Sequence, residues 1–241
     1  MVAFACIGLF LLYKGGWIKL AFNKKYIRNA LHFGVPLVPH ALGATMMTMM
    51  DRFFITNMVG LSATGLYSVG YQIGMVIGLL GTSVNQAYVP WLFEKLKQDN
   101  KAIKKSIVKI TYVYFILITS LAIGLSLIAP WFLGFFVGEK FAGSGIYVFW
   151  IALAYAFNSM YTMVVNYIFY VEKTYILAGI TFSCAALNIP LNYALIKWNG
   201  PVGAAQAHAL TLFMFFLLTW ILSSRVYKMP WLLSWGKRNV F

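Results

Sequence analysis

Two adjacent ionisable residues, Asp51 and Arg52, lie inside the apolar stretch from about 35 to 59, in a chain with only 10% charged residues. An ionised side chain near the centre of a membrane-spanning helix costs about 2.5–3.5 kcal/mol on insertion scales, so it normally faces a protein-lined or water-filled interior and often marks a substrate or ion path. We therefore expect function at this pair, with Asp51 as a candidate proton or sodium site. The alternatives are structural. Asp51 could neutralise Arg52 or a partner on another helix, and Arg52 could reach the external headgroups.

The segments that position this pair are apolar and are separated by short basic or Gly/Pro/Asn-rich breaks. Hydrophobic residues make up 61% of the 241 residues, which together with such long runs indicates a helical membrane protein. The predicted segments are 1–13, 35–59, 66–90, 107–129, 146–170, 175–196 and 203–223. The first would reach only about 20 Å, against a hydrocarbon core of about 30 Å. The sequence thus predicts an all-α, polytopic transmembrane helical bundle with six full spans and a partial first span.

The net charge of +14 follows the order of these segments and does not indicate a nucleic-acid surface. Lysine and arginine cluster after the first, third and last segments, in 14–28, 95–109 and 225–238. Basic connections favour the cytoplasmic side, where the leaflet is anionic. We therefore expect a multi-pass membrane protein with a cytoplasmic carboxy terminus.

The first segment has no basic residue before it and several after it, which is opposite to the polarity of a signal peptide. This order is typical of the last helix of a preceding bundle, so we expect the chain to be part of a longer protein. We divide it into three parts. Residues 1–28 are the end of a preceding transmembrane helix and a basic cytoplasmic linker, residues 29–224 are a six-helix lobe, and residues 225–241 are a basic cytoplasmic tail.

Residues 34–74 combine several features that occur together in one family. A proline-bearing helix entry at Pro36 and Pro39 precedes the Asp-Arg pair, and a short glycine-bounded loop leads to a Tyr-Ser helix start at Tyr67. This stretch resembles the seventh and eighth helices of bacterial polysaccharide flippases of the multidrug/oligosaccharidyl-lipid/polysaccharide exporter superfamily. The resemblance extends from about residue 14 to the tail, and it would cover the carboxy-terminal half of a family member.

The resemblance implies translocation of an undecaprenyl-diphosphate-linked oligosaccharide, such as an O-antigen, capsule or exopolysaccharide repeat unit, across the cytoplasmic membrane. The chain would be the second lobe of an alternating-access flippase, with a missing amino-terminal lobe on the same or a separate chain. No bond would be broken and no cofactor is expected. Arg52 would suit an anionic diphosphate, because a guanidinium presents fixed paired donors to phosphate oxygens.

Other polar residues within the segments extend the candidate site. His40 precedes Asp51 by eleven residues, about three helical turns, so the two share a face but lie too far apart to touch. His208 is expected to form hydrogen bonds between helices. Four further candidates could line a hydrated, sugar-binding wall or could equally form interhelical hydrogen bonds: Asn158, Thr162, Asn166 and Asn188.

Other function classes remain open. One alternative is a cation-coupled small-molecule exporter of the same superfamily, and another is a non-transporting partner of a separately encoded first lobe. A membrane-embedded polysaccharide-modifying transferase would need acids or metal ligands, and no two of the five acidic residues make a convincing catalytic pair. Cys6 and Cys184 have no spacing that indicates a disulfide or a metal site.

Overall fold

The computed structural model describes residues 2–17 and 23–232, and every regular element in these ranges is helical. The predicted all-α class is therefore confirmed. Parts of the predicted basic linker and tail, residues 18–22 and 233–241, lie outside the described ranges. The elements are α1 (Val2–Lys14), α2 (Lys24–Gly34), α3 (Leu37–Met58), α4 (Leu61–Lys97), α5 (Lys101–Phe132), the π-helical turn η1 (Leu133–Val137), the 3-10 helix η2 (Glu139–Ser144), α6 (Gly145–Tyr170), α7 (Tyr175–Asn199) and α8 (Val202–Val226).

Among the described residues, five helices are long and apolar enough to cross a membrane, α4 to α8. The prediction of six full spans is corrected at α3, which has the necessary length at 22 residues but a more polar composition. The cause is the set of polar side chains that this helix carries, among them His40, Asp51 and Arg52. The predicted partial first span is α1, a short apolar helix.

The helix boundaries follow from local sequence. The Asn23 side chain accepts a hydrogen bond from the backbone of Lys25 at 3.0 Å and begins α2, and Asn100 does the same for α5 with Ala102 at 2.8 Å. The turn between α3 and α4 is tight because Gly60 has a φ of +129°, a conformation that favours glycine. This turn brings the end of α3 directly against the start of α4.

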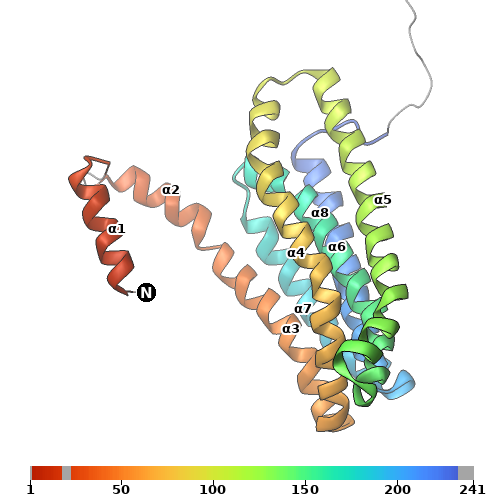
Figure 1. The fold of residues 1–241 in the computed structure, drawn as a ribbon. Coiled ribbons are helices and arrows are strands. Elements are labelled where there is room, and N and C mark those ends of the chain that lie inside the picture. The colour runs from red at the N-terminus through yellow and green to blue at the C-terminus, as the bar shows by residue number, and fades with distance from the viewer. Residues whose placement is uncertain (1, 18–22, 233–241) are drawn as a thin grey trace, which may run out of the picture.

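The helices pack around α6. This helix lies between α4 and α8, with α5 also against it, while α7 packs on α8 and α3 packs on α7. Close approach of α4 depends on small residues, because a methyl group added at Gly74 would lie 2.7 Å from Cγ2 of Ile151. Figure 1 shows the resulting bundle, with α1 and α2 standing away from it and α3 leaning into it.

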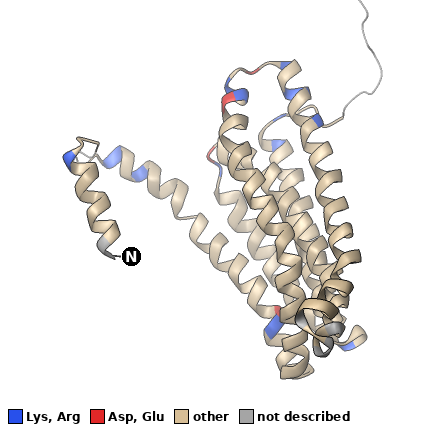
Figure 2. Cartoon of the chain, viewed as in Figure 1, with Lys and Arg blue, Asp and Glu red and all other residues tan. Residues whose placement is uncertain are grey.

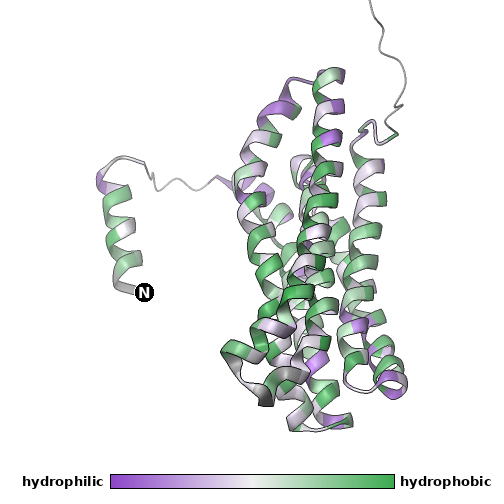
Figure 3. Cartoon of the chain, turned by 45° about the vertical axis from the view of Figure 1, so that its right-hand side comes forward, coloured by the Kyte–Doolittle hydropathy of each residue, from purple (hydrophilic) through white to green (hydrophobic). Residues whose placement is uncertain are grey.

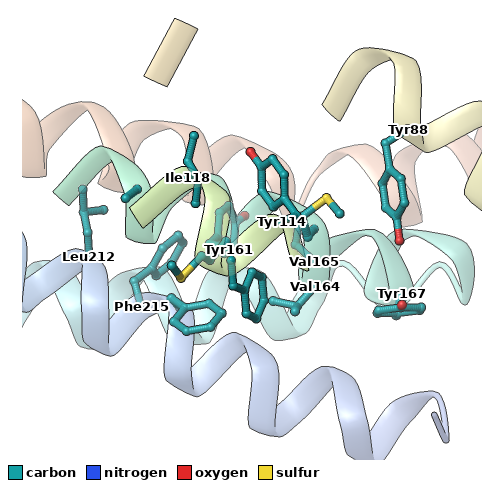
Figure 4. Close-up of a cluster of buried hydrophobic side chains, with 14 of the residues drawn as sticks. Tyr88, Tyr114, Ile118, Tyr161, Val164, Val165, Tyr167, Leu212 and Phe215 are labelled. Atoms are coloured by element: carbon teal, nitrogen blue, oxygen red, sulfur yellow. The ribbon is translucent and has the colours of Figure 1, made fainter. Parts of the chain in front are cut away.

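The core of the bundle is rich in aromatic residues. Figure 4 shows side chains of α6, including Tyr161, Val164 and Tyr167, packed between helices on both sides. Tyr161 packs on Phe215 of α8 with ring centroids 4.4 Å apart. The arrangement fixes α8 against α6 and so fixes the position of the side chains along α8.

Hydrophobic residues make up much of the length of the long helices, and hydrophilic residues gather toward the helix ends, as Figure 3 shows. Ile116 and Leu127 on α5 are 70% and 76% exposed, which is the pattern of a surface solvated by lipid chains. Most charged residues gather at the end of the bundle where α4 meets α5 (Figure 2). Lys104 lies over the ring of Tyr227 there, with 5.0 Å between the Nζ atom and the ring centroid, so the 98–100 connection and the end of α8 share that end.

Candidate functional site

Asp51 is completely buried, accepts hydrogen bonds from two other helices and contacts a histidine on a third. The hydroxyl of Tyr67 on α4 donates to Oδ2 at 3.0 Å, and Nδ2 of Asn192 on α7 donates to Oδ1 at 3.0 Å. Nδ1 of His208 on α8 lies 2.8 Å from Oδ2. Four helices therefore converge on one carboxylate, and the high cost of burying an acid is offset by paired donors.

A second layer of amides orients these partners. Nδ2 of Asn192 also lies 3.1 Å from both the backbone oxygen and Oδ1 of Asn188, one turn earlier on α7. Asn188 in turn donates to Oγ1 of Thr211 on α8 at 3.1 Å. Asn188, predicted as a site residue, is therefore connected to Asp51 through Asn192.

Arg52 does not pair with Asp51. Its guanidinium carbon lies 4.7 Å from the ring centroid of Tyr71 on α4, a cation–π arrangement. The Tyr71 hydroxyl accepts a hydrogen bond from Tyr155 of α6 at 2.6 Å. In the described part of the chain no carboxylate comes within salt-bridge distance of Arg52. Of the two partners considered for Asp51, Arg52 and a residue on another helix, the structure places the second, His208, against the carboxylate.

A small cavity of about 110 Å³ is lined in part by His208, the residue that contacts Asp51. A water molecule needs only about 10–15 Å³ of such space, so the cavity is large enough for several. Its lining includes Thr48, Tyr155, Asn158, His208 and Thr211. Polar side chains of α3, α6 and α8 thus face a common space within the bundle.

His40 belongs to a separate cluster. Its Nδ1 lies 2.5 Å from Oγ1 of Thr181 on α7, and its ring stacks on Phe215 of α8 with centroids 6.1 Å apart. The hydroxyl of Tyr161 lies 3.5 Å from Nε2. The prediction that His40 and Asp51 are too far apart to touch agrees with these distinct partners.

The three polar residues predicted as a wall on α6 do not line one cavity. Asn158 faces the cavity beside His208, whereas the Thr162 hydroxyl donates to the backbone oxygen of Ser159 at 2.7 Å. Nδ2 of Asn166 donates to Oδ1 of Asn85 on α4 at 2.9 Å. Asn158 and Asn166 are eight residues apart, about 12 Å along the helix, which places them at different levels of the bundle. Asn166 therefore forms an interhelical hydrogen bond, which was one of the two roles considered for it.

Three direct partners of Asp51 were not among the predicted site residues: Tyr67, Asn192 and His208. Two carry a signal in the sequence. Asn192 follows Asn188 by one helical turn on a polar face, and His208 is an uncommon ionisable residue in an apolar segment. The expectation that His208 bonds between helices is confirmed by its contact with Asp51.

Residues that could bind a metal are scattered. Across residues 2–17 and 23–232, no group of three or more His, Cys, Asp or Glu side chains lies close enough to hold an ion. Cys6 is exposed and Cys184 is buried, and both are free thiols. The side chains of Asp51, Arg52 and His208 can exchange protons, form hydrogen bonds and, at Arg52, attract an anion.

Comparisons with known proteins agree with this architecture. The family model described as "Polysaccharide biosynthesis protein" matches residues 2–146, which include Asp51 and Arg52. A Lsg locus protein of Haemophilus influenzae is 24% identical over 216 residues, which are 86% of this chain and 54% of that protein. An uncharacterized membrane protein of the same organism is 33% identical over 146 residues, 60% of this chain and 35% of that protein.

The chain spans about half the length or less of the curated relatives it matches. The family match covers more than half of the chain itself, and several of its helices are long and apolar enough to span a membrane. The chain is therefore a multi-pass membrane protein that belongs to the polysaccharide biosynthesis protein family.

Proposed function

We propose that this chain translocates an undecaprenyl-diphosphate-linked oligosaccharide, such as an O-antigen, capsule or exopolysaccharide repeat unit, across the cytoplasmic membrane. Membership of the polysaccharide biosynthesis family supports the class of substrate, and the membrane-spanning helices support a path across the bilayer. No bond is broken in this proposal, because the lipid tail stays in the bilayer while the sugar-diphosphate head crosses.

The observation that carries the proposal is the placement of Arg52. The adjacent acid, Asp51, contacts Tyr67, Asn192 and His208. It therefore forms no ion pair with the guanidinium of Arg52. Arg52 instead lies over Tyr71, partly exposed, with its N–H donors directed to no described carboxylate. The Arg52 guanidinium lies in an apolar bundle, and its N–H groups remain available to a ligand. It therefore suits a diphosphate, whose oxygens accept paired hydrogen bonds.

The size of the internal cavity supports a second lobe as partner. About 110 Å³ admits water but is far below the roughly 300–1,000 Å³ of a typical small-molecule pocket. A larger pocket of about 370 Å³ between α3 and α7 has an almost wholly apolar lining, which does not suit a hydroxylated sugar. We therefore infer that an oligosaccharide head takes a path between this bundle and another one. We propose an amino-terminal lobe, on the same or a separate chain, and alternating access between the two.

The orientation belongs to the same proposal. The basic connections near residues 98–100 and the end of α8 share one end of the bundle, which we assign to the cytoplasm because cytoplasmic connections are enriched in lysine and arginine. The carboxy terminus is then cytoplasmic, and the membrane is the bacterial inner membrane.

The test is translocation of a fluorescent lipid-linked oligosaccharide in proteoliposomes that contain the chain assembled with its amino-terminal lobe. We expect Arg52→Ala to lower the initial rate at least about tenfold, equivalent to about 1.4 kcal/mol or more. Arg52→Lys should retain part of the rate, because an ammonium keeps the charge but not the paired geometry. Arg28→Ala, on the exposed α2, is the matched control.

Two results would contradict the proposal. One is a wild-type rate for Arg52→Ala at an equal amount of folded protein. The other is an equal effect of Arg52→Ala on a lipid-linked oligosaccharide that lacks the diphosphate, because the guanidinium would then act on something other than phosphate.

A further inference from the structure

The second ring nitrogen of His208 has no hydrogen-bond partner. Nδ1 lies 2.8 Å from Oδ2 of Asp51, but Nε2 is buried and contacts no donor or acceptor in the described part of the chain. The His208 side chain is only 2% exposed. A buried polar group without a partner costs about 1–3 kcal/mol, and an exception of this kind calls for an explanation.

His208 also lines the cavity of about 110 Å³. Most of the cavity lining is apolar, and Asn158 and Thr211 are polar residues that also lie on it. A cavity of this volume is large enough to hold water, from which a proton can reach the imidazole. The unpartnered nitrogen and the adjoining cavity are independent observations at the same residue.

Every helix packed around His208 contributes to its electrostatic environment. Asp51 is the one acid that touches the ring, and Arg52 is the neighbouring cation over Tyr71. The Tyr71 and Tyr155 rings lie 5.8 Å and 6.3 Å from the imidazole, between centroids. α7 contributes the uncharged Asn192. The ionisable groups are thus Asp51 and Arg52 on α3, Tyr67 and Tyr71 on α4, and Tyr155 on α6.

We propose that Asp51 and His208 form a proton-binding site. The lone pair of Nε2 takes up a proton from water in the cavity, while the Nδ1 proton stays directed at Asp51. The imidazolium that forms is compensated by the carboxylate beside it. Imidazole is the side chain suited to this exchange, because it changes charge between about pH 5 and 8 when unperturbed.

The same geometry disfavours a metal cation as the ligand. Hard cations bind through several oxygen atoms. Both oxygens of Asp51 already accept hydrogen bonds, from Tyr67 and Asn192, and His208 presents a nitrogen. A sodium ion would have to displace these donors, whereas a proton adds to Nε2 without displacing any contact.

Proton uptake changes the charge near Arg52. With His208 neutral, Asp51 and Arg52 sum to zero, and with His208 protonated the three residues carry one positive charge. An anionic diphosphate near Arg52 is then bound more strongly when the site holds its proton. This step rests on the proposed function, whereas proton binding at His208 does not.

The direct test is nitrogen NMR of the chain in lipid bilayers with isotope-labelled histidine. The chain has three histidines, so the His208 signal is assigned by its loss in His208→Asn. We expect Nε2 of His208 to change from an imine-like to a protonated chemical shift as the pH is lowered across the range in which the protein stays folded. Asp51→Asn should change that transition, because it removes the compensating carboxylate. An Nε2 signal that stays in one protonation state over this range would overturn the proposal.

A misfolded variant would be recognised from the His32 and His40 signals, which should stay at their wild-type positions in His208→Asn. If the His32 and His40 signals move in His208→Asn, the variant His208→Gln is used for the assignment instead. The titration itself is measured on the wild-type chain, so the result does not depend on either variant.

The consequence for transport is tested in proteoliposomes with a pH gradient, using the chain assembled with its amino-terminal lobe. Coupling to one proton predicts that the accumulation ratio of the lipid-linked oligosaccharide changes about tenfold per pH unit. His208→Asn should abolish this dependence, and His32→Asn on α2 should keep it. A titrating His208 without oligosaccharide transport would contradict the proposed function but not the proton site. Transport without any titration of His208 would contradict the proton site but not the proposed function.

Discussion

Nδ1 of His208 lies 2.8 Å from Oδ2 of Asp51, and this contact joins the first helix of the bundle, α3, to the last, α8. Both side chains are almost completely inaccessible, at 2% and 0% exposure. Tyr67 and Asn192 bind the same carboxylate from α4 and α7. The contact explains how an acid is retained in a bundle that has lipid as its surrounding solvent, and it leaves the charge of Arg52 available.

Removal of the Asp51 carboxylate should destabilise the bundle. Asp51→Leu leaves the Tyr67 hydroxyl and Nδ1 of His208 without their acceptor, whereas Nδ2 of Asn192 still has Asn188, so we expect a loss of about 2–6 kcal/mol in the free energy of unfolding. Asp51→Asn keeps one acceptor oxygen and should cost less. Reversible unfolding in mixed micelles measures both. Equal stability of Asp51→Leu and the wild type would show that the carboxylate does not hold the four helices together.

The close approach of α4 to α6 provides a matched pair of glycine substitutions on one helix. Gly74→Ala places a methyl group against Ile151 and should cost about 1–3 kcal/mol. No side-chain or backbone atom lies within 4 Å of a methyl group at Gly65, so Gly65→Ala should be neutral or stabilising by up to about 1 kcal/mol. Thermal unfolding in detergent compares them. The packing of α4 on α6 would be wrong if Gly74→Ala were as stable as Gly65→Ala.

Asn85 and Asn166 should contribute a modest interhelical hydrogen bond. Nδ2 of Asn166 donates to Oδ1 of Asn85 at 2.9 Å, and such bonds in membrane bundles average about 0.6 kcal/mol with a maximum near 1.7 kcal/mol. A double-mutant cycle with Asn85→Ala and Asn166→Ala measures the coupling energy. A coupling energy of zero would show that this hydrogen bond does not stabilise the bundle. Asn166 would then remain a candidate for the predicted sugar-binding wall.

The proposed orientation places the α3–α4 turn and the α4–α5 connection on opposite sides of the membrane. In a background of Cys6→Ser and Cys184→Ala, Ser62→Cys should react with an impermeant thiol reagent from the periplasmic side. Lys101→Cys should react with the same reagent only after the membrane is permeabilised, so that the reagent reaches the cytoplasmic side. Labelling of both positions from one side would refute the assignment of spans.

The sequence predicted the helices well and the site only in part. Continuous apolar runs fix α6, α7 and α8 to within a few residues, because a spanning helix must be apolar over most of its length. The prediction for α4 was too short, 66–90 against Leu61–Lys97, since its polar ends do not contribute to an apolar window. The predicted boundary between the basic linker and the six-helix lobe, after residue 28, lies inside α2 (Lys24–Gly34). Basic and apolar residues alternate along α2 with a helical period, which composition alone does not reveal.

At the site, Asp51 and Arg52 could be recognised because charge is rare within the apolar segments. Their partners could not be recognised, because Asn192 lies 141 residues from Asp51 and the two meet only through the packing of α3 on α7. For the same reason the sequence left open whether Asp51 pairs with Arg52 or with another helix. The tertiary arrangement decides that Asp51 binds His208 and that Arg52 lies over Tyr71.

The central claim is that Arg52 binds the diphosphate of the lipid-linked substrate. The most direct measurement is nitrogen–phosphorus dipolar recoupling by solid-state NMR, with arginine-labelled chain assembled with its amino-terminal lobe and loaded with lipid-linked oligosaccharide. The chain has four arginines, and the Arg52 signal is assigned by its loss in Arg52→Lys. If Arg52 binds the diphosphate, we expect its guanidinium signal to dephase as it does at a nitrogen–phosphorus separation of about 4 Å, the separation in a direct hydrogen bond. The claim would be contradicted if the substrate were bound and the Arg52 signal showed no dephasing.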